Sequence, residues 1–362
     1  MEQAKIPTMF AGVLTPDGYR SHLEDCYDPE DGWRAYLIKG GAGMGKSTLM
    51  KRVLAAVVEQ GGRARCIPCP SDPDSLDGVV FEDKKICLLD ATAPHIVNSK
   101  YPVVCELLVD MAAACDPEKL RGSREAILET DRRLSGHYRR ASRYLAAIRA
   151  LQKDSYRVAY DACDRTRATR FAAGLADRLF PKKNGRGRET VVFLSALTPK
   201  GHLAFPDTVS LLCDRVIAVE DEYGAASRLI LSTLRMAALE AGYDIVTGMC
   251  PLEPEEKVEH LLIPELRLGF VTRNRWLDLP TTERIVHVRR FEDVSALHQK
   301  RQRLSFNRRA VNELIAGTCQ TLAQAKAVHD QLEALYAPAM DFARLDAIAQ
   351  PILSECLKES RA

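Results

Sequence analysis

A glycine-rich segment contains the residues of this chain that are best suited to chemistry. It reads GGAGMGKST between residues 40 and 48, and its spacing matches GxxxxGK[ST] between an apolar run and an amphipathic stretch. Glycines let backbone N–H groups turn toward an anion, and a helix that starts here adds the positive end of its dipole. The pattern predicts a loop that binds the phosphates of ATP, formed by Gly40, Gly41, Ala42, Gly43, Met44, Gly45, Lys46, Ser47 and Thr48.

Polar side chains at the end of this loop have separate expected roles. Lys46 is expected to neutralise the β- and γ-phosphates, the Ser47 hydroxyl to bind Mg²⁺, and Thr48 to contact the α-phosphate. The ion also needs an acidic residue at the end of a buried strand. Asp90 ends the apolar run KICLLD and is predicted to hold Mg²⁺ through water. The alternative is that Asp90 only caps the turn ATAPH.

No glutamate follows Asp90, so the general base that many ATPases place there must come from elsewhere or be absent. The nearest acidic candidates lie in PSDPDSLD and are Asp72, Asp74 and Asp77. Each of them is equally well explained as a side-chain cap in a turn. His95, just beyond Asp90, is a candidate sensor of the γ-phosphate or another turn cap.

The segments that must position these residues occur twice. VLTPDGY (13–19) returns as ALTPKGH (196–202), and RAYLIKGGAGMGKSTLM (34–50) aligns with RVIAVEDEYGAASRLIL (215–231), at a spacing close to half of the 362 residues. In each copy an apolar run, a loop, an amphipathic stretch and further apolar runs follow in the same order. Strand, helix and strand joined by short loops predict parallel pairing.

The predicted fold class is α/β, with a tandem duplication of a P-loop NTPase-like parallel-sheet unit. A mostly helical segment follows each copy, because apolar residues there recur at helical spacing. The first domain is placed at residues 1–185, with a helical insert at about 101–180. The second is placed at 186–362, with a helical tail at about 291–357, and PKKNGRG (181–187) has the composition of a linker.

The second copy is expected not to bind nucleotide. At the place of the glycine loop it reads EDEYGAAS, so that Ala226 aligns with Lys46 and Thr272 with Asp90. Three consecutive carboxylates, residues 220–222, are predicted to repel a triphosphate. Like charges about 4 Å apart cost on the order of 4 kcal/mol at an effective dielectric constant near 20. We therefore expect one nucleotide per chain.

Composition limits the other classes of function. No apolar run is long enough for a membrane helix and the first residues do not resemble a signal peptide, so a cytoplasmic location without a membrane partner is expected. Eleven scattered cysteines do not form a disulfide pattern. Cys66 and Cys69 form one CxxC, but neither a second pair nor histidines at ligand spacing accompany it, so zinc is not predicted.

One basic segment stands out from a net charge of only +2. Between residues 119 and 188, Lys and Arg outnumber Asp and Glu by 19 to 7. These basic helices are a candidate surface for an anionic partner or a source of an arginine for the triphosphate. The alternative is a solvated hairpin with its acidic complement in EPEEKVE (253–259) or in the second loop. Nucleic acid is possible but not favoured at a pI of about 8.0.

GGAGMGKS, CPSDPDSLDG (69–78) and DATAPH (90–95) together resemble known proteins. The chain is similar to the P-loop NTPase superfamily, and more closely to a group of bacterial tandem-P-loop ATPase-like proteins. This resemblance runs over the full length and implies ATP binding. The expected function is a slow Mg²⁺-dependent ATPase with its active site in the first copy. The alternatives are a small-molecule or nucleotide kinase and a non-catalytic, nucleotide-gated binding module.

Overall fold

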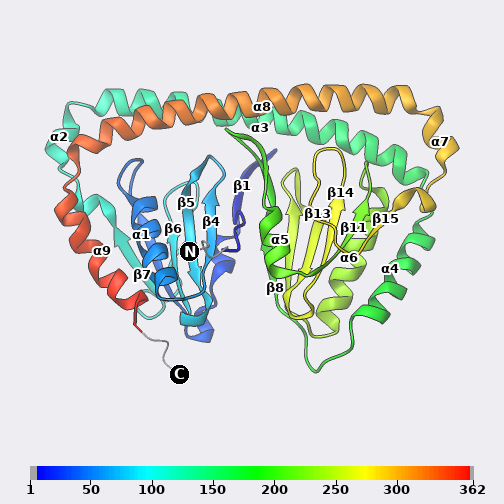
Figure 1. Ribbon diagram of the computed structural model, residues 1–362. Helices are drawn as coiled ribbons and strands as arrows, with labels where there is room; N and C mark the ends of the chain where they lie inside the picture. Colours follow the sequence, from blue (N-terminus) through cyan, green and yellow to red (C-terminus); the bar gives the residue numbers. More distant parts are fainter. Residues whose placement is uncertain (1–5, 359–362) are drawn as a thin grey trace.

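The computed structural model describes residues 6–358 and contains two α/β units that lie side by side beneath a roof of two long helices (Figure 1). The roof consists of α3 (Arg124–Asp161) and α8 (Arg301–Tyr336), which pack against each other. About half of the residues are helical, and both sheets contain parallel strands. Among the described residues, no helix has both the length and the apolar character needed to cross a membrane.

Five strands form the first sheet: β3 (Arg34–Lys39), β4 (Arg65–Cys69), β5 (Asp72–Phe81), β6 (Ile86–Asp90) and β7 (Glu106–Asp110). Their order is β4-β5-β6-β3-β7. Strand β3 is parallel to β6 and to β7, whereas β5 is antiparallel to β4 and to β6. Strand β4 is therefore separated from β3 by two strands, although only helix α1 (Lys46–Glu59) and short loops connect them in sequence.

Six strands form the second sheet: β8 (Glu189–Val192), β11 (Arg215–Glu220), β12 (Ile245–Cys250), β13 (Glu253–Ile263), β14 (Leu268–Arg273) and β15 (Arg284–His287). Their order is β15-β11-β14-β13-β12-β8. Taken from β12 to β15, the order and the directions of pairing are those of the first sheet. Strand β8 is an addition that pairs in parallel with β12.

A short hairpin precedes β3 in the first unit and β11 in the second, and both hairpins have the same turn. The strands are β1 (Gly12–Thr15) with β2 (Gly18–Ser21), and β9 (Ser195–Thr198) with β10 (Gly201–Ala204). In each turn the threonine hydroxyl donates to the carbonyl of the glycine three residues later, at 2.7 and 2.8 Å. These turns are formed by the repeated sequence LTPxG.

The two units exchange helices. Helix α4 (Arg165–Leu179) continues from the first roof helix and packs against α6 (Ala225–Glu240) of the second unit. Conversely, α9 (Phe342–Cys356) follows the second roof helix and packs against α1 of the first unit. Ile352 and Cys356 of α9 belong to the apolar core around Met50 and Val53 of α1. Each unit thus receives a covering helix from the other half of the sequence.

The remaining elements are short. The α-helices are α2 (Pro117–Arg121), α5 (Pro206–Leu212) and α7 (Val294–Gln299). Single 3₁₀ turns are η1 (Leu23–Cys26), η2 (Pro29–Asp31), η3 (Glu82–Lys84), η4 (Met111–Ala114), η5 (Pro264–Leu266), η6 (Val288–Phe291) and η7 (Ala337–Ala339). One difference from expectation concerns residues 106–110, which fall in the segment predicted to be helical from residue 101. They form β7 because β3 offers them a free edge to pair with, and the helices begin only at Pro117.

Candidate functional site

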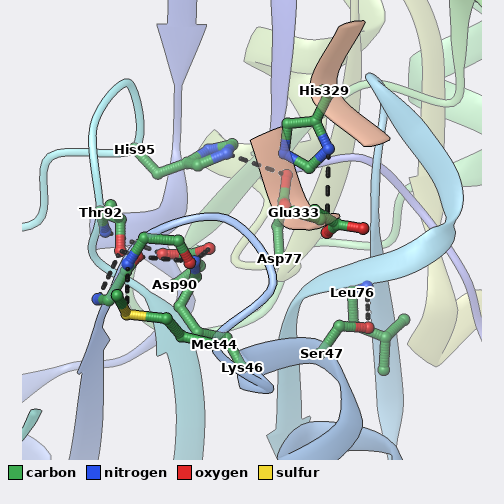
Figure 2. A network of polar contacts seen from close by, with 12 residues as sticks. Met44, Lys46, Ser47, Leu76, Asp77, Asp90, Thr92, His95, His329 and Glu333 are labelled. Carbon is green, nitrogen blue, oxygen red and sulfur yellow. Dashed lines mark hydrogen bonds and ion pairs between the residues drawn. The ribbon is translucent and has the colours of Figure 1, made fainter. Parts of the chain in front are cut away.

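The glycine loop of residues 40–45 connects the carboxyl end of β3 to the amino end of α1 (Figure 2). Two of its residues, Gly43 and Gly45, have positive φ angles of 71° and 82°, a conformation that side chains strongly disfavour. Gly45 is the residue that precedes the helix. The first backbone N–H groups of α1 have no partner within the helix, so they are oriented toward the space that the loop surrounds.

Lys46, the first residue of α1, folds its side chain back onto this loop. Its Nζ donates hydrogen bonds to the carbonyl oxygens of Gly40 and Gly41, at 2.7 and 2.9 Å. The same Nζ lies 3.6 Å from the carboxylate of Asp90, which ends the neighbouring strand β6. Both side chains are largely buried, with 14% and 12% of their surface exposed. The cation is thus held close to the loop, within reach of an anion that enters it.

Asp90 also has the capping contact that the sequence left as an alternative. Its Oδ1 accepts a hydrogen bond from the backbone N–H of Thr92 at 2.8 Å. The Thr92 hydroxyl in turn donates to the carbonyl of Gly40 at 3.0 Å. The turn after β6 is therefore tied to the glycine loop, and the cap occupies one oxygen of the carboxylate while the other, Oδ2, faces Lys46.

The other predicted loop residues differ in their surroundings. Ser47 Oγ accepts a hydrogen bond from the backbone N–H of Leu76 in β5, at 3.0 Å. Thr48 is exposed. Met44 is buried, and its sulfur accepts a hydrogen bond from the N–H of Gly41 at 3.0 Å. Ala42 packs beneath the roof helices.

The three acidic candidates for a general base lie in different environments. Asp74 is exposed, and its carboxylate accepts from Lys200 of the second hairpin at 2.6 Å. Asp72 lies 3.6 Å from Lys326 of α8. Asp77 is buried, and its Oδ2 lies 3.6 Å from Nε2 of His95. Burial raises the pKa of the Asp77 carboxyl to about 6, although the nearby imidazole acts in the opposite direction.

Helix α8 covers the glycine loop, a feature that sequence reasoning missed. A Cβ at Gly43 would lie 3.0 Å from the backbone carbonyl oxygen of Glu333 and 3.1 Å from its Cα. A Cβ at Gly41 would lie 3.5 Å from the ring of Tyr336. The side chains of Glu333 and His329 extend from α8 over the loop (Figure 2). Sequence spacing holds no signal for these contacts, because they join opposite ends of the chain.

The loop at the corresponding place in the second sheet is built differently. It joins β11 to α6 and is also preceded by a strand and ended by a glycine with positive φ, Gly224 at 79°. The residue directly after β11 is Asp221, whose side chain turns back into the loop. Its Oδ1 accepts from the N–H groups of Tyr223 and Gly224, at 3.0 and 2.8 Å. Its Oδ2 accepts from those of Ala226 and Ser227, at 3.0 and 2.8 Å.

These hydrogen bonds change the reason why the second copy is not expected to bind nucleotide. The three carboxylates do not converge, because Glu220 pairs with His287 and Glu222 with Arg275. Only Asp221 enters the loop, where it is 1% exposed. By position before the helix, Ala225 rather than Ala226 is the counterpart of Lys46, so alanine replaces the lysine in either alignment.

A cavity of about 110 Å³ lies between the second loop and the roof. Its apolar side is lined by Leu14 and Leu197 of the two hairpins and by Val311 of α8. Its polar side includes Asp221 and Arg228, and the Arg228 guanidinium is paired with a buried glutamate. Both of these polar side chains therefore already pair with other groups of the protein.

The basic segment is partly neutralised within the protein. Lys153 lies 3.2 Å from Glu253 and 3.5 Å from Glu256, in the acidic stretch that the sequence offered as its complement. Arg149 donates to Asp17 at 3.0 Å. Nearer the amino end of α3, Arg139 and Arg140 are exposed. An anionic partner on these helices stays a prediction.

Comparison of the chain with protein-family models, with curated proteins and with solved structures found no match in any of the three. The residues of the first loop, Lys46, Ser47 and Asp90 lie together at one end of the first sheet. Asp74 lies apart from them, in an ion pair with the second hairpin. A function is therefore proposed from the geometry of the first loop.

Proposed function

We propose that the chain binds one Mg²⁺-bound ATP at residues 40–48 and hydrolyses it slowly. The observation that carries this proposal is the position of Lys46, held by the loop carbonyls at the start of α1 and 3.6 Å from the strand-terminal Asp90. A lysine, a helix amino end and glycine N–H groups around one space are the components of a triphosphate site.

Oxygen donors that fit Mg²⁺ are present at this place. Ser47 Oγ accepts one hydrogen bond, from Leu76, and a hydroxyl oxygen has a second lone pair for an ion. The Asp90 carboxylate has an oxygen that is not used by the Thr92 cap. When bound, Mg²⁺ supplies neutralisation of the charge on the β- and γ-phosphate oxygens. Lys46 supplies the remaining positive charge once it exchanges its loop carbonyls for phosphate.

Hydrolysis is proposed to be slow because, among the described residues, each of the three acidic candidates for a general base is either paired with a lysine or buried. Asp74 and Asp72 are engaged with lysines of other elements. Asp77, the third candidate, is buried and lies 3.6 Å from the His95 imidazole.

We further propose that the two units arose by tandem duplication of a P-loop-type unit and that only the first binds nucleotide. The shared strand order and the positive-φ glycine before each helix support the duplication. The Asp221 carboxylate supports the proposal that the second unit binds no nucleotide. It accepts hydrogen bonds from four backbone N–H groups of the kind that would bind a phosphate.

Nucleotide binding is proposed to act on the roof. The backbone of α8 at Glu333 touches the loop at Gly43, so a change in the loop's shape must move the helix or be opposed by it. Helix α8 also lines the cavity of the second unit through Asn307 and Val311. One rigid helix therefore connects the nucleotide site with the second unit.

Isothermal titration of the full chain with Mg-ATP tests the proposal. We expect a fitted stoichiometry of one nucleotide per chain, and slow release of inorganic phosphate without any added acceptor. Transfer only to an added acceptor would identify a phosphotransferase, and binding without turnover a nucleotide-gated module. Absence of saturable binding would overturn the nucleotide site itself.

Substitution Asp90→Asn is expected to remove the Mg²⁺ dependence of ATP binding and any hydrolysis. The amide keeps an oxygen for the Thr92 cap, so the fold should persist, but it lacks the charge that attracts the ion. Affinity measured without Mg²⁺ should stay within a few-fold of that of the wild type. The matched control is Asp74→Asn, an exposed carboxylate of the same sheet. A variant at residue 90 with an undiminished Mg²⁺-dependent rate would show that Asp90 is only a cap.

A further inference from the structure

We propose that Cys69, Asp77 and His95 form a binding site for a transition-metal ion of the zinc type, beside the nucleotide loop. The three residues come from the end of β4, from β5 and from the turn after β6. One ligand atom of each lies within 4.8 Å of the others. The site is distinct in its ligands from the Mg²⁺ position at Ser47 and Asp90.

The separation of the ligand atoms suits coordination better than hydrogen bonding. Nε2 of His95 and Oδ2 of Asp77 are 3.6 Å apart, too far for a hydrogen bond. Ligand bonds of about 2.1 Å in a tetrahedral zinc site place two ligand atoms roughly 3.4 Å from each other. The Asp77–His95 pair therefore already has about the separation that two ligands of one ion require, and the Cys69 sulfur lies within 4.8 Å of both ligand atoms.

Two of the three residues of the cluster are buried, and their polar atoms are not all hydrogen-bonded within the described part of the chain. Asp77 is 3% exposed and His95 7% exposed. Asp77 Oδ2 is buried and has no hydrogen-bond partner among the described residues. A buried polar atom without a hydrogen-bond partner is costly. A bound cation would give this oxygen its missing partner.

The orientation of the histidine is fixed by packing. The ring of Tyr19 meets the His95 ring edge-on, with centroids 4.7 Å apart. His95 belongs to the same turn as Thr92, which is hydrogen-bonded to Gly40 of the nucleotide loop. A metal ion at the cluster would thus hold the turn that braces this loop.

The ligand types select the ion. A cysteine sulfur disfavours Mg²⁺ and Ca²⁺, which prefer oxygen, and together with imidazole and carboxylate it favours Zn²⁺ or Co²⁺. Three protein ligands leave the fourth position of a tetrahedral ion for water or another small ligand. The CxxC motif alone does not reveal this site, because only its second cysteine belongs to the cluster.

The test is metal binding by the full chain after removal of metals with a chelator. We expect one equivalent of Zn²⁺ per chain, and with Co²⁺ the visible absorption bands of a thiolate-bound tetrahedral ion. Cys69→Ser and His95→Gln should each weaken binding by at least tenfold. Cys66→Ser is the matched control, since it removes the other cysteine of the motif and should leave affinity unchanged.

Equal binding by the wild type and by Cys69→Ser would overturn the proposal, as would a loss in Cys66→Ser as large as that in Cys69→Ser. Thermal melts establish that the variants are folded. If either Cys69→Ser or His95→Gln does not fold, zinc binding by the other variant tests the proposal. The same measurement on Lys46→Ala separates this site from the nucleotide site. Zinc binding at one equivalent per chain should persist there, whether or not ATP binding is lost.

Discussion

Substitution Lys46→Ala is expected to weaken ATP binding by well over tenfold while leaving the fold intact. A triphosphate carries roughly four negative charges, and a lysine within the loop supplies a charge-assisted hydrogen bond that alanine cannot replace. Each loss of about 1.4 kcal/mol lowers affinity tenfold. The side chain contacts loop carbonyls and Asp90 rather than the apolar core, so its removal should not unfold the first unit.

Titration calorimetry with ATP measures this effect. The matched control is Lys51→Ala, an exposed lysine of the same helix that lies outside the loop. Unchanged affinity in a folded Lys46→Ala protein would refute the assignment of the site. If this variant still binds ATP at a saturable site, the proposal that the second unit does not bind nucleotide is wrong.

Substitution Asp221→Ala is expected to destabilise the protein by about 3 kcal/mol or more, and to make its stability depend on phosphate. Loss of the carboxylate leaves four backbone N–H groups without their acceptor, and hydrogen bonds to a charged group contribute about 1.5–3 kcal/mol each. A ligand that binds only the folded state raises its stability in proportion to the logarithm of its concentration. Inorganic phosphate should therefore raise the melting temperature of this variant.

Thermal melts at increasing phosphate concentration measure the second effect. Glu222→Ala is the matched control, because it removes the adjacent carboxylate, which pairs with Arg275 outside the loop. Phosphate should affect the control and the wild type equally and weakly. If phosphate stabilises Asp221→Ala no more than Glu222→Ala, the second loop is not an anion-binding structure that Asp221 fills.

The first loop could be predicted because its residues are close together in the sequence. Strand β3, the glycine loop and helix α1 are contiguous, so spacing alone places Lys46 at the helix start, and the apolar run KICLLD places Asp90 at the end of β6. The expected pairing of strand, helix and strand is less direct, because β5 and β6 lie between β3 and β4. Neighbours in sequence need not be neighbours in a sheet.

The features that escaped prediction depend on long-range packing. Cys69, Asp77 and His95 meet only because the β4–β5 pair and the turn after β6 come together at one end of the sheet. The contact of Glu333 with Gly43 requires α8 to return across both units. The loop of Asp221 shows another limit, since charge counting foresaw repulsion but not a carboxylate that accepts four hydrogen bonds from its own loop.

The exchange of helices α4 and α9 has a consequence for how the chain is made. As the polypeptide leaves the ribosome, the strands of the first sheet emerge early, but α9, which supplies Ile352 and Cys356 to their core, emerges only after the whole second sheet. Domains generally fold one after another during synthesis, the N-terminal one first. Here the first unit must keep part of its apolar surface uncovered until translation has passed through the second. The earliest residues to be made are thus among the last to be completely packed.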